Sequence, residues 1–275
     1  MSDNKIIKLD VAAALKEKLP RLTIPKFIVN YLRKIAHEEE FNYFFEHNPD
    51  LKGVDFMEGA FHFFDAKVDV IGKENLPIDP RFILVSNHPL GGLDGITIPY
   101  IFGRHYNDKI LLLTNDLLMN LHPLKDIFIP INKSGAQSKH TAELANRMYE
   151  SDNLIFTFPA GLCSRKIKGE IVDLEWKKNF INKAVSFQRD VVPIYFEGRN
   201  SNFFYNLSNL RKRLGIKINI EMLYLSDEMF NQKGKQLKIV IGKPIAWQTF
   251  DKTKTPTQWA QWVKGKTYDL KNQAK

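Results

Sequence analysis

The chain has 275 residues, of which 44% are hydrophobic, with 40 Lys and Arg against 31 Asp and Glu, a net charge of +9. This length is enough for one large buried core with an appended segment, and charged residues interrupt every apolar stretch that approaches the length of a spanning helix. The lone Cys163 excludes an intrachain disulfide, and the N-terminus shows no signal-peptide pattern. We therefore expect a cytoplasmic protein whose basic excess favours anionic partners: phospholipid headgroups, an acidic carrier protein or nucleic acid.

Residues 1–65 are predicted to be helical. Phe27, Tyr31, Leu32 and Ile35 recur at helical spacing, and an aromatic group follows between positions 41 and 64. Two interpretations stay open: the aromatic residues form ordinary core, or the segment is amphipathic and lies in a membrane interface. Both hold if one face packs on the protein and the other binds lipid.

Residues 66–275 are predicted to form the catalytic domain, because short apolar runs alternate with longer amphipathic ones. This alternation is typical of an α/β fold with a mixed, largely parallel sheet flanked by helices. Helices are expected at 138–150, 175–188 and 256–271. The expected strands are 67–71, 82–86, 110–114, 126–131, 154–158, 191–196, 216–223 and 237–241.

The stretch FILVSNHPLGGLDG at 82–95 carries the first candidate chemistry. His88 follows a buried strand, at the carboxyl end where α/β proteins gather ligands. A neutral imidazole can accept a proton from a hydroxyl when a carboxylate holds its other N–H, and Asp94 is the nearest candidate. Gly91 and Gly92 would let the loop fold back to bring the two together. The alternative is a tight turn in which Asp94 only caps the next helix.

A second segment, LIFTFPAGLCSRKIKGE at 154–170, places a glycine loop after another strand. Backbone N–H groups around Gly161, with Ser164 and Arg165 nearby, are predicted to hold an oxyanion or part of an acyl donor. The alternative is a solvated basic loop. A third strand, VVPIYFEGRNS at 191–201, also ends in polar residues, among them Arg199, so one shared rim is expected.

The order of these motifs resembles the lysophospholipid acyltransferase family, whose members transfer a fatty acyl group from a thioester to a hydroxyl. The resemblance runs from about Ile71 to Pro244 and rests on four stretches: NHPLGGLDG, DIFIPINKSG, FPAGLCSR and VVPIYFEG. It implies a glycerolipid-acyltransferase-like fold, a catalytic His88–Asp94 pair, and acyl carrier protein or acyl-CoA as co-substrate, with no other cofactor and no metal.

Three departures from the family pattern bear on the substrate. His88 and Asp94 are separated by five residues where the family pattern has four, and the second block has no clear phosphate-binding arginine. Ala160 and Leu162 replace the usual Glu and Thr of the third block. These features resemble the haemolysin-like branch, which includes enzymes that O-acylate aminolipids such as ornithine or glycine lipids.

That branch implies an acceptor hydroxyl on the 3-hydroxyacyl chain of an N-acyl amino acid. Its carboxylate would need a cation, for which Lys133, Lys177, Arg199 and Arg165 are candidates. The sequence predicts an enzyme bound peripherally to the inner face of the cytoplasmic membrane.

Three other functions remain open at this stage: a lysophosphatidate or glycerolipid acyltransferase, a hydrolase using Ser164 or Cys163, and a non-catalytic basic membrane-binding protein. No motif supports nucleic-acid binding.

Overall fold

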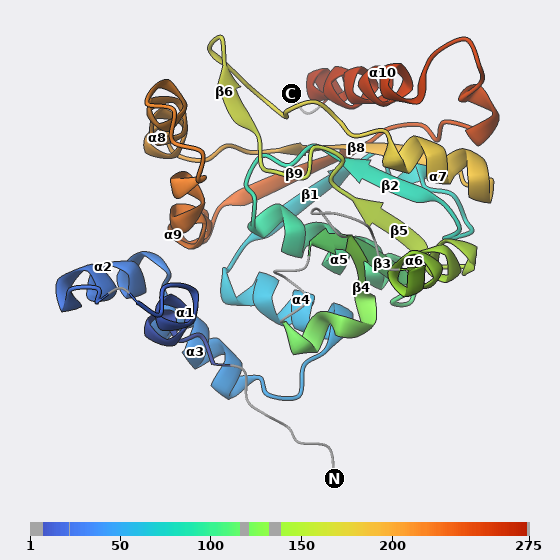
Figure 1. Ribbon diagram of the computed structural model, residues 1–275. Helices are drawn as coiled ribbons and strands as arrows, with labels where there is room; N and C mark the ends of the chain where they lie inside the picture. Colours follow the sequence, from blue (N-terminus) through green and yellow to red (C-terminus); the bar gives the residue numbers. More distant parts are fainter. Residues whose placement is uncertain (1–7, 22, 116–120, 132–138, 274–275) are drawn as a thin grey trace.

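A seven-stranded sheet forms the centre of the computed structural model, which describes residues 8–21, 23–115, 121–131 and 139–273 (Figure 1). The strand order is β1-β9-β8-β2-β5-β3-β4, and all neighbours pair in parallel except β8 and β9. The predicted α/β class with a mixed, largely parallel sheet is confirmed. The strands are β1 (Lys67–Ile71), β2 (Ile83–Ser86), β3 (Ile110–Asn115), β4 (Phe128–Ile131), β5 (Leu154–Thr157), β8 (Val191–Glu197) and β9 (Gln236–Ile241), with a separate hairpin of β6 (Arg165–Ile167) and β7 (Glu170–Val172).

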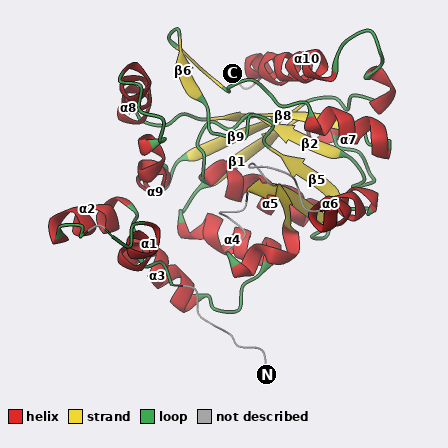
Figure 2. Ribbon diagram, in the orientation of Figure 1, coloured by secondary structure: helices red, strands yellow, loops and turns green. Residues whose placement is uncertain are grey.

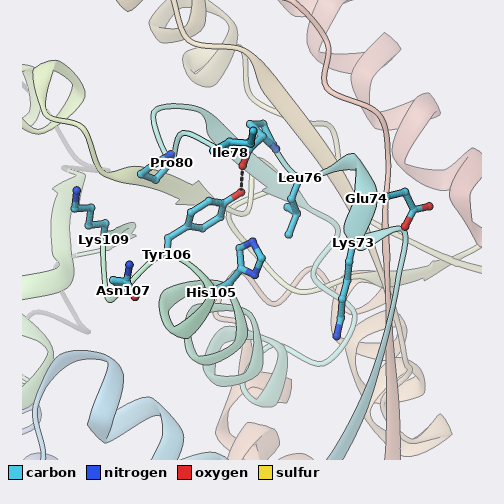
Figure 3. Close-up of a pocket in the computed structure, with 10 residues that line it drawn as sticks. Lys73, Glu74, Leu76, Ile78, Pro80, His105, Tyr106, Asn107 and Lys109 are labelled. Atoms are coloured by element: carbon cyan, nitrogen blue, oxygen red, sulfur yellow. Dashed lines mark hydrogen bonds between the residues drawn. The ribbon is translucent and has the colours of Figure 1, made fainter.

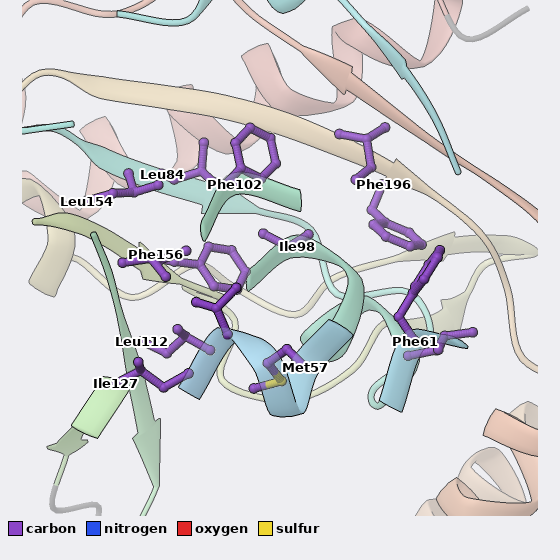
Figure 4. Packing of buried hydrophobic residues seen from close by; sticks show 14 of the residues in the cluster. Met57, Phe61, Leu84, Ile98, Phe102, Leu112, Ile127, Leu154, Phe156 and Phe196 are labelled. Carbon is purple, nitrogen blue, oxygen red and sulfur yellow. The ribbon is translucent and has the colours of Figure 1, made fainter. Parts of the chain in front are cut away.

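Helices cover both faces of the sheet (Figure 2), so its central strands β2 and β5 are buried at every position and mostly apolar. Successive side chains of β2 alternate between the two layers: Leu84 packs with α4 and α5, whereas Ile83 and Val85 pack with α6, α7 and α10. Figure 4 shows the first layer, where Met57 of α4 and Ile98 of α5 meet Phe156 of the sheet.

The α-helices follow the chain around the sheet, several with recognisable start signals. Thr255 caps α10 with a capping box completed by Gln258, and Ser201 caps α8. The helices are α1 (Val11–Lys18), α2 (Lys26–Ile35), α3 (Glu38–His47), α4 (Gly53–Phe63), α5 (Leu93–His105), α6 (Lys139–Glu150), α7 (Asn179–Phe187), α8 (Asn202–Arg213), α9 (Leu225–Phe230) and α10 (Pro256–Asp269). Short 3₁₀ segments are η1 (Lys73–Asn75), η3 (His122–Ile127), η4 (Ile220–Tyr224), η5 (Trp247–Thr249) and η6 (Leu270–Gln273).

One predicted strand, 216–223, is wrong. The stretch instead turns into η4 (Ile220–Tyr224). The alternation of Ile216, Ile218 and Ile220 imitates a strand, but Ile218 is 76% exposed and the buried member of the stretch is the charged Glu221. Burial of this glutamate depends on ion pairs with Arg165 and Arg211, which lie in other elements and which a local pattern does not reveal. Several boundaries also shift by one to four residues: for example, the strand predicted from 126 begins at Phe128, and the helix predicted from 175 begins at Asn179.

The N-terminal region is helical, as predicted, and its parts differ in how they pack. Phe44 of α3 and Phe61 of α4 are buried in the same layer as α5. By contrast, α2 leaves Phe27 73% exposed and Tyr31 49% exposed. Figure 1 shows α1, α2 and α3 on one side of the molecule, near α9. The division into two domains at residue 65 stays a prediction.

Among the helices that the structure describes, none combines the length and the apolar character needed to cross a membrane.

Candidate functional site

His88 lies just beyond the end of β2, in the middle of the sheet. The preceding residue fixes this strand end to β8: the Asn87 side chain donates to the Phe196 carbonyl at 2.9 Å and accepts from the Phe196 N–H at 2.7 Å. The His88 side chain is 14% exposed and stacks on Phe158, with ring centroids 3.7 Å apart. The imidazole is thus held between two strand ends with part of its surface reachable from outside.

Asp94 is bonded to His88, as the sequence predicts for an orienting carboxylate. Its Oδ2 lies 2.9 Å from His88 Nδ1 and also accepts the Leu90 N–H at 3.0 Å, while Oδ1 accepts the Gly95 N–H at 2.9 Å. The side chain is fully buried in the first turn of α5, where the helix dipole and these donors favour a carboxylate. An ionised Asp94 makes His88 Nδ1 the donor, which leaves Nε2 able to accept a proton.

The two glycines between this pair serve different purposes. Gly91 has φ +79°, the left-handed conformation expected of it, and a Cβ there would lie 2.9 Å from the Cys163 Cβ. Gly92 has an ordinary negative φ, but its Cβ would lie 2.3 Å from the Met229 sulfur. The five-residue spacing between His88 and Asp94 is therefore accommodated by the left-handed conformation of Gly91 and by the close packing of Gly92 against Met229.

The glycine loop of the third block lies next to His88 through Phe158. Gly161 has φ +68°, and its N–H donates to the Phe158 carbonyl at 3.0 Å, so this amide is used within its own turn. A Cβ on Gly161 would lie 3.5 Å from Lys177 Nζ, which places that amino group over the loop. Gly161 and Lys177 both line a hollow of about 780 Å³. The residues around it are Ala160, Gly161, Leu162, Leu174, Glu175, Trp176, Lys177, Lys178, Asn219 and Thr257.

Ser164 and Arg165 make contacts inside the protein. The Ser164 hydroxyl donates to Asp173 at 2.6 Å, and its N–H donates to the His88 carbonyl at 2.7 Å. The Arg165 side chain is 2% exposed and forms an ion pair with Glu221 at 3.1 Å. Both residues support the loop in this structure, and their direct roles in donor binding stay predictions.

The candidate acceptor cations are not gathered at one point. Arg199 is exposed and donates to Asn202 at 2.6 Å. Lys177 is exposed at the hollow beside Gly161. Lys133 lies outside the described residues.

The sequence reasoning missed Asp173, which lies after β7 and is 1% exposed. Its carboxylate accepts the His88 N–H at 3.2 Å, the Ser164 hydroxyl at 2.6 Å and the Trp176 indole N–H at 2.8 Å. In the sequence Asp173 is one of three acidic residues, with Glu170 and Glu175, between basic ones, which gives no indication of its burial. Phe158 was part of a quoted motif, but its stack on His88 was not foreseen.

The buried thiol of Cys163 argues against a cysteine nucleophile. Burial raises its pKa to about 11, so the thiol is protonated at neutral pH, and Sγ accepts from Arg165 at 2.9 Å. The Ser164 hydroxyl is likewise bound to Asp173. In the described part of the chain, neither the Cys163 thiol nor the Ser164 hydroxyl is hydrogen-bonded to the His88 imidazole, as the hydrolase interpretation would require.

A second hollow, of about 440 Å³, lies at the other end of α5 (Figure 3). His105 and Tyr106 line it, and the Tyr106 hydroxyl donates to the Pro77 carbonyl at 2.6 Å. Because α5 has 13 residues, its two ends are about 20 Å apart. This hollow is separate from the His88 site.

Within the described ranges, no group of three or more His, Cys, Asp or Glu side chains is placed to hold a metal ion. The expectation of metal-free chemistry stays a prediction.

A buried Asp–His pair at the carboxyl edge of an α/β sheet defines a site suited to proton transfer from a hydroxyl. The family model described as "Acyltransferase" matches residues 13–275, and the chain belongs to that family. The family resemblance found in the four sequence blocks is confirmed, and the chain is an acyltransferase.

Two relatives cover almost the whole chain. A lyso-glycine lipid O-acyltransferase of Phocaeicola vulgatus is 53% identical over 272 residues, 98% of each chain. The protein of the same name from Bacteroides thetaiotaomicron is 52% identical and covers 98% of this chain and 100% of its own. The crystal structure of the 1-acyl-sn-glycerophosphate acyltransferase PlsC from Thermotoga maritima covers 94% of this chain and 92% of its own, with 17% identity and a TM-score of 0.49.

Proposed function

We propose that this acyltransferase transfers a fatty acyl group from a thioester to the hydroxyl of an N-(3-hydroxyacyl) amino acid, with glycine as the amino acid. The proposal rests on the His88–Asp94 pair, with Nδ1 and Oδ2 2.9 Å apart and Asp94 fully buried. The choice of glycine follows from the name of the two relatives at 53% and 52% identity.

In the proposed mechanism His88 Nε2 removes the proton from the acceptor hydroxyl as its oxygen attacks the thioester carbonyl. Asp94 keeps the proton on Nδ1 and stabilises the imidazolium that forms. The imidazolium then protonates the departing thiolate, so His88 returns to its neutral form. A base of this kind contributes about 10²- to 10⁴-fold, and the rest of the acceleration comes from holding two lipids in position and from oxyanion contacts.

The oxyanion would be held by amides that follow Gly161. Gly161 itself donates within its turn, and Ser164 donates to the His88 carbonyl. The N–H groups of Leu162 and Cys163 lie between them, and no backbone acceptor for either is found in the described part of the chain. These two amides are the donors that we assign, and each such donor typically contributes about 3 kcal/mol to transition-state stabilisation.

The donor would be an acyl carrier protein or acyl-CoA, both of which carry phosphate on the arm that bears the thioester. Lys177 Nζ lies over the Gly161 loop and beside the 780 Å³ hollow, where it suits such a phosphate or the carboxylate of the acceptor. Arg199 and Lys133 are the other proposed acceptor cations.

We also propose that the enzyme works on a membrane surface through α2. Its exposed Phe27 and Tyr31 are accompanied by Lys26 and Arg33, and the chain carries a net charge of +9. The Tyr31 hydroxyl is 2.8 Å from that of Tyr224 in η4, which fixes α2 to the body of the protein.

The reaction is tested by lipid mass spectrometry of cells that express the wild type or His88→Ala, with N-(3-hydroxyacyl) glycine and lysophospholipids both available. Only the wild type is expected to form the diacylated glycine lipid. Formation of a phosphatidate instead would contradict the acceptor assignment, and near-normal product from His88→Ala would contradict the mechanism.

Membrane binding is tested by co-sedimentation with anionic phospholipid vesicles. Phe27→Glu is expected to weaken binding at least several-fold, because it removes apolar contact and adds repulsion. Ile78→Glu is the matched control, since Ile78 is fully exposed on the loop between β1 and β2. Equal binding by the two variants would contradict the role of α2.

A further inference from the structure

Asp173 accepts hydrogen bonds from three segments that are far apart in the sequence. They are the His88 N–H after β2, the Ser164 hydroxyl of the glycine loop, and the Trp176 indole before α7. Its own main chain is held by α10, where the Tyr268 hydroxyl accepts its N–H at 2.8 Å and Lys264 donates to its carbonyl at 2.7 Å. The carboxylate thus joins the strand that carries the base to the loop beside it.

Both main-chain polar groups of His88 are bound by this part of the structure. The N–H donates to Asp173, and the carbonyl accepts from the Ser164 N–H at 2.7 Å. Asp173 also holds the Ser164 side chain, so one carboxylate controls both attachments. The His88 side chain is oriented separately, by Asp94 and by the stack on Phe158.

From this geometry we propose that Asp173 is a positioning residue of the acyl transfer: it fixes the main chain of His88 so that the imidazole keeps its bond to Asp94 and its direction toward the acceptor. Asp173 acts through His88 and contacts no substrate. The proposal deepens the function proposed above and rests on His88 being the base.

Burial makes an ionised aspartate at this position costly to stability. Among the residues that the structure describes, its carboxylate accepts hydrogen bonds from neutral donors only, since Lys264 binds the main-chain carbonyl and not the carboxylate. Burial raises the pKa of Asp173, against the opposing effect of the bonds from Ser164, Trp176 and His88. An acid whose pKa is raised by folding lowers stability as the pH rises through that value. The contacts of the carboxyl group with the His88 main chain and with Ser164 give it a role in the site.

The test is Asp173→Asn, with Asp69→Asn as the matched control because Asp69 is exposed on the edge strand β1. The amide has the shape of the carboxylate but only one acceptor oxygen. With that oxygen at Oδ1, where His88 and Ser164 donate, its NH₂ group faces the Trp176 indole N–H, and this donor against a donor displaces the Asp173 side chain and the groups bound to it. We expect kcat to fall by about 10- to 100-fold, the range that follows from a small misplacement of a reacting group, while KM changes less than threefold. Asp69→Asn is expected to match the wild type.

A spectroscopic readout tests the same point without any substrate. An imidazole N–H bonded to a carboxylate gives a downfield proton NMR signal, which is assigned here by its loss in His88→Ala. In Asp173→Asn this signal is expected to shift or broaden, and in Asp69→Asn to stay unchanged. This measurement decides the proposal even if none of the offered lipids is the substrate.

Ser164→Ala provides a second variant if Asp173→Asn does not fold, because it removes one attachment and keeps the carboxylate. We expect a smaller loss of kcat at unchanged KM and the same direction of change in the NMR signal. A rise in donor KM alone would instead support direct donor binding by Ser164. If Asp173→Asn folds, an unchanged NMR signal in that variant would overturn the proposal. If it does not fold, an unchanged signal in Ser164→Ala would overturn it.

Discussion

Asp94→Asn is the most informative change at the His88 pair, because the surrounding donors determine how the new amide is oriented. Oδ2 accepts from His88 and from the Leu90 N–H, with the Gly91 N–H at 3.4 Å, whereas Oδ1 accepts only from Gly95 among the described residues. The amide oxygen is therefore expected at the Oδ2 position. His88 then keeps its proton on Nδ1, and the new NH₂ group faces the Gly95 N–H.

The expected loss of activity follows from this orientation. Hydrogen bonds to a charged group contribute about 1.5–3 kcal/mol, and neutral ones about 0.5–1.5 kcal/mol. Replacing the charged acceptor by a neutral one weakens the hydrogen bond to the imidazolium in the transition state. This raises the activation free energy by about 1–2 kcal/mol, which lowers kcat roughly 5- to 30-fold. Where an asparagine amide instead reverses the histidine tautomer, the loss reaches about 10⁴-fold. The donors around Asp94 predict the smaller loss.

The assay is steady-state acyl transfer by the wild type, Asp94→Asn, His88→Ala and the double variant, with folding checked by circular dichroism. The double variant is expected to be no worse than His88→Ala, because the carboxylate acts through the imidazole. Wild-type activity of Asp94→Asn would refute the role of Asp94, and a 10⁴-fold loss would refute the argument on amide orientation. The unsatisfied Gly95 N–H should also lower the free energy of unfolding by about 1–3 kcal/mol, measurable by urea denaturation.

Two further predictions concern residues that support the loop. Glu221→Gln should lower the free energy of unfolding by about 3–5 kcal/mol in urea denaturation, because buried Arg165 and Arg211 both lose their counter-charge. The control, Glu197→Gln at an exposed ion pair, should lower it by less than about 1 kcal/mol. Equal losses in the two variants would contradict the role assigned to Glu221. Cys163→Ala should retain kcat within about twofold, and the native thiol should resist labelling by a disulfide reagent at pH 8, because its pKa is about 11. Rapid labelling of the folded protein would show that the thiol is accessible.

The sequence predicted the features of this protein that depend on local pattern. The seven strands of the main sheet were expected because each is a short run rich in apolar residues and bounded by polar or turn residues, and His88 was identified because it follows one of them. The bond to Asp94 could also be foreseen, since a six-residue separation with two glycines limits where the carboxylate can lie. What failed was the interpretation of alternating isoleucines at 216–223 as a strand, when the burial of Glu221 is set by long-range ion pairs.

The position of Asp173 could not be predicted, because its importance depends on contacts with residues 85 and 9 positions before it and 3 after it. Arg165 shows the same limit: a basic residue in a glycine loop suggests an anionic ligand, but here its partner is a buried glutamate. A sequence pattern indicates the chemical type of a side chain and the expected exposure of its helix or strand. It does not report which distant segment will neutralise it.

The arrangement around His88 separates two requirements that a general base must meet. Its tautomer is set by Asp94, which lies on α5 and is stabilised by backbone donors of its own loop. Its location is set by Asp173 and Ser164, which follow a different strand and connect to α10. Asp94→Asn should therefore leave the main chain of His88 in place, whereas Asp173→Asn should move it and keep the carboxylate partner. Because Asp173 acts through the bond that Asp94 makes, the two variants are expected to be non-additive in kcat.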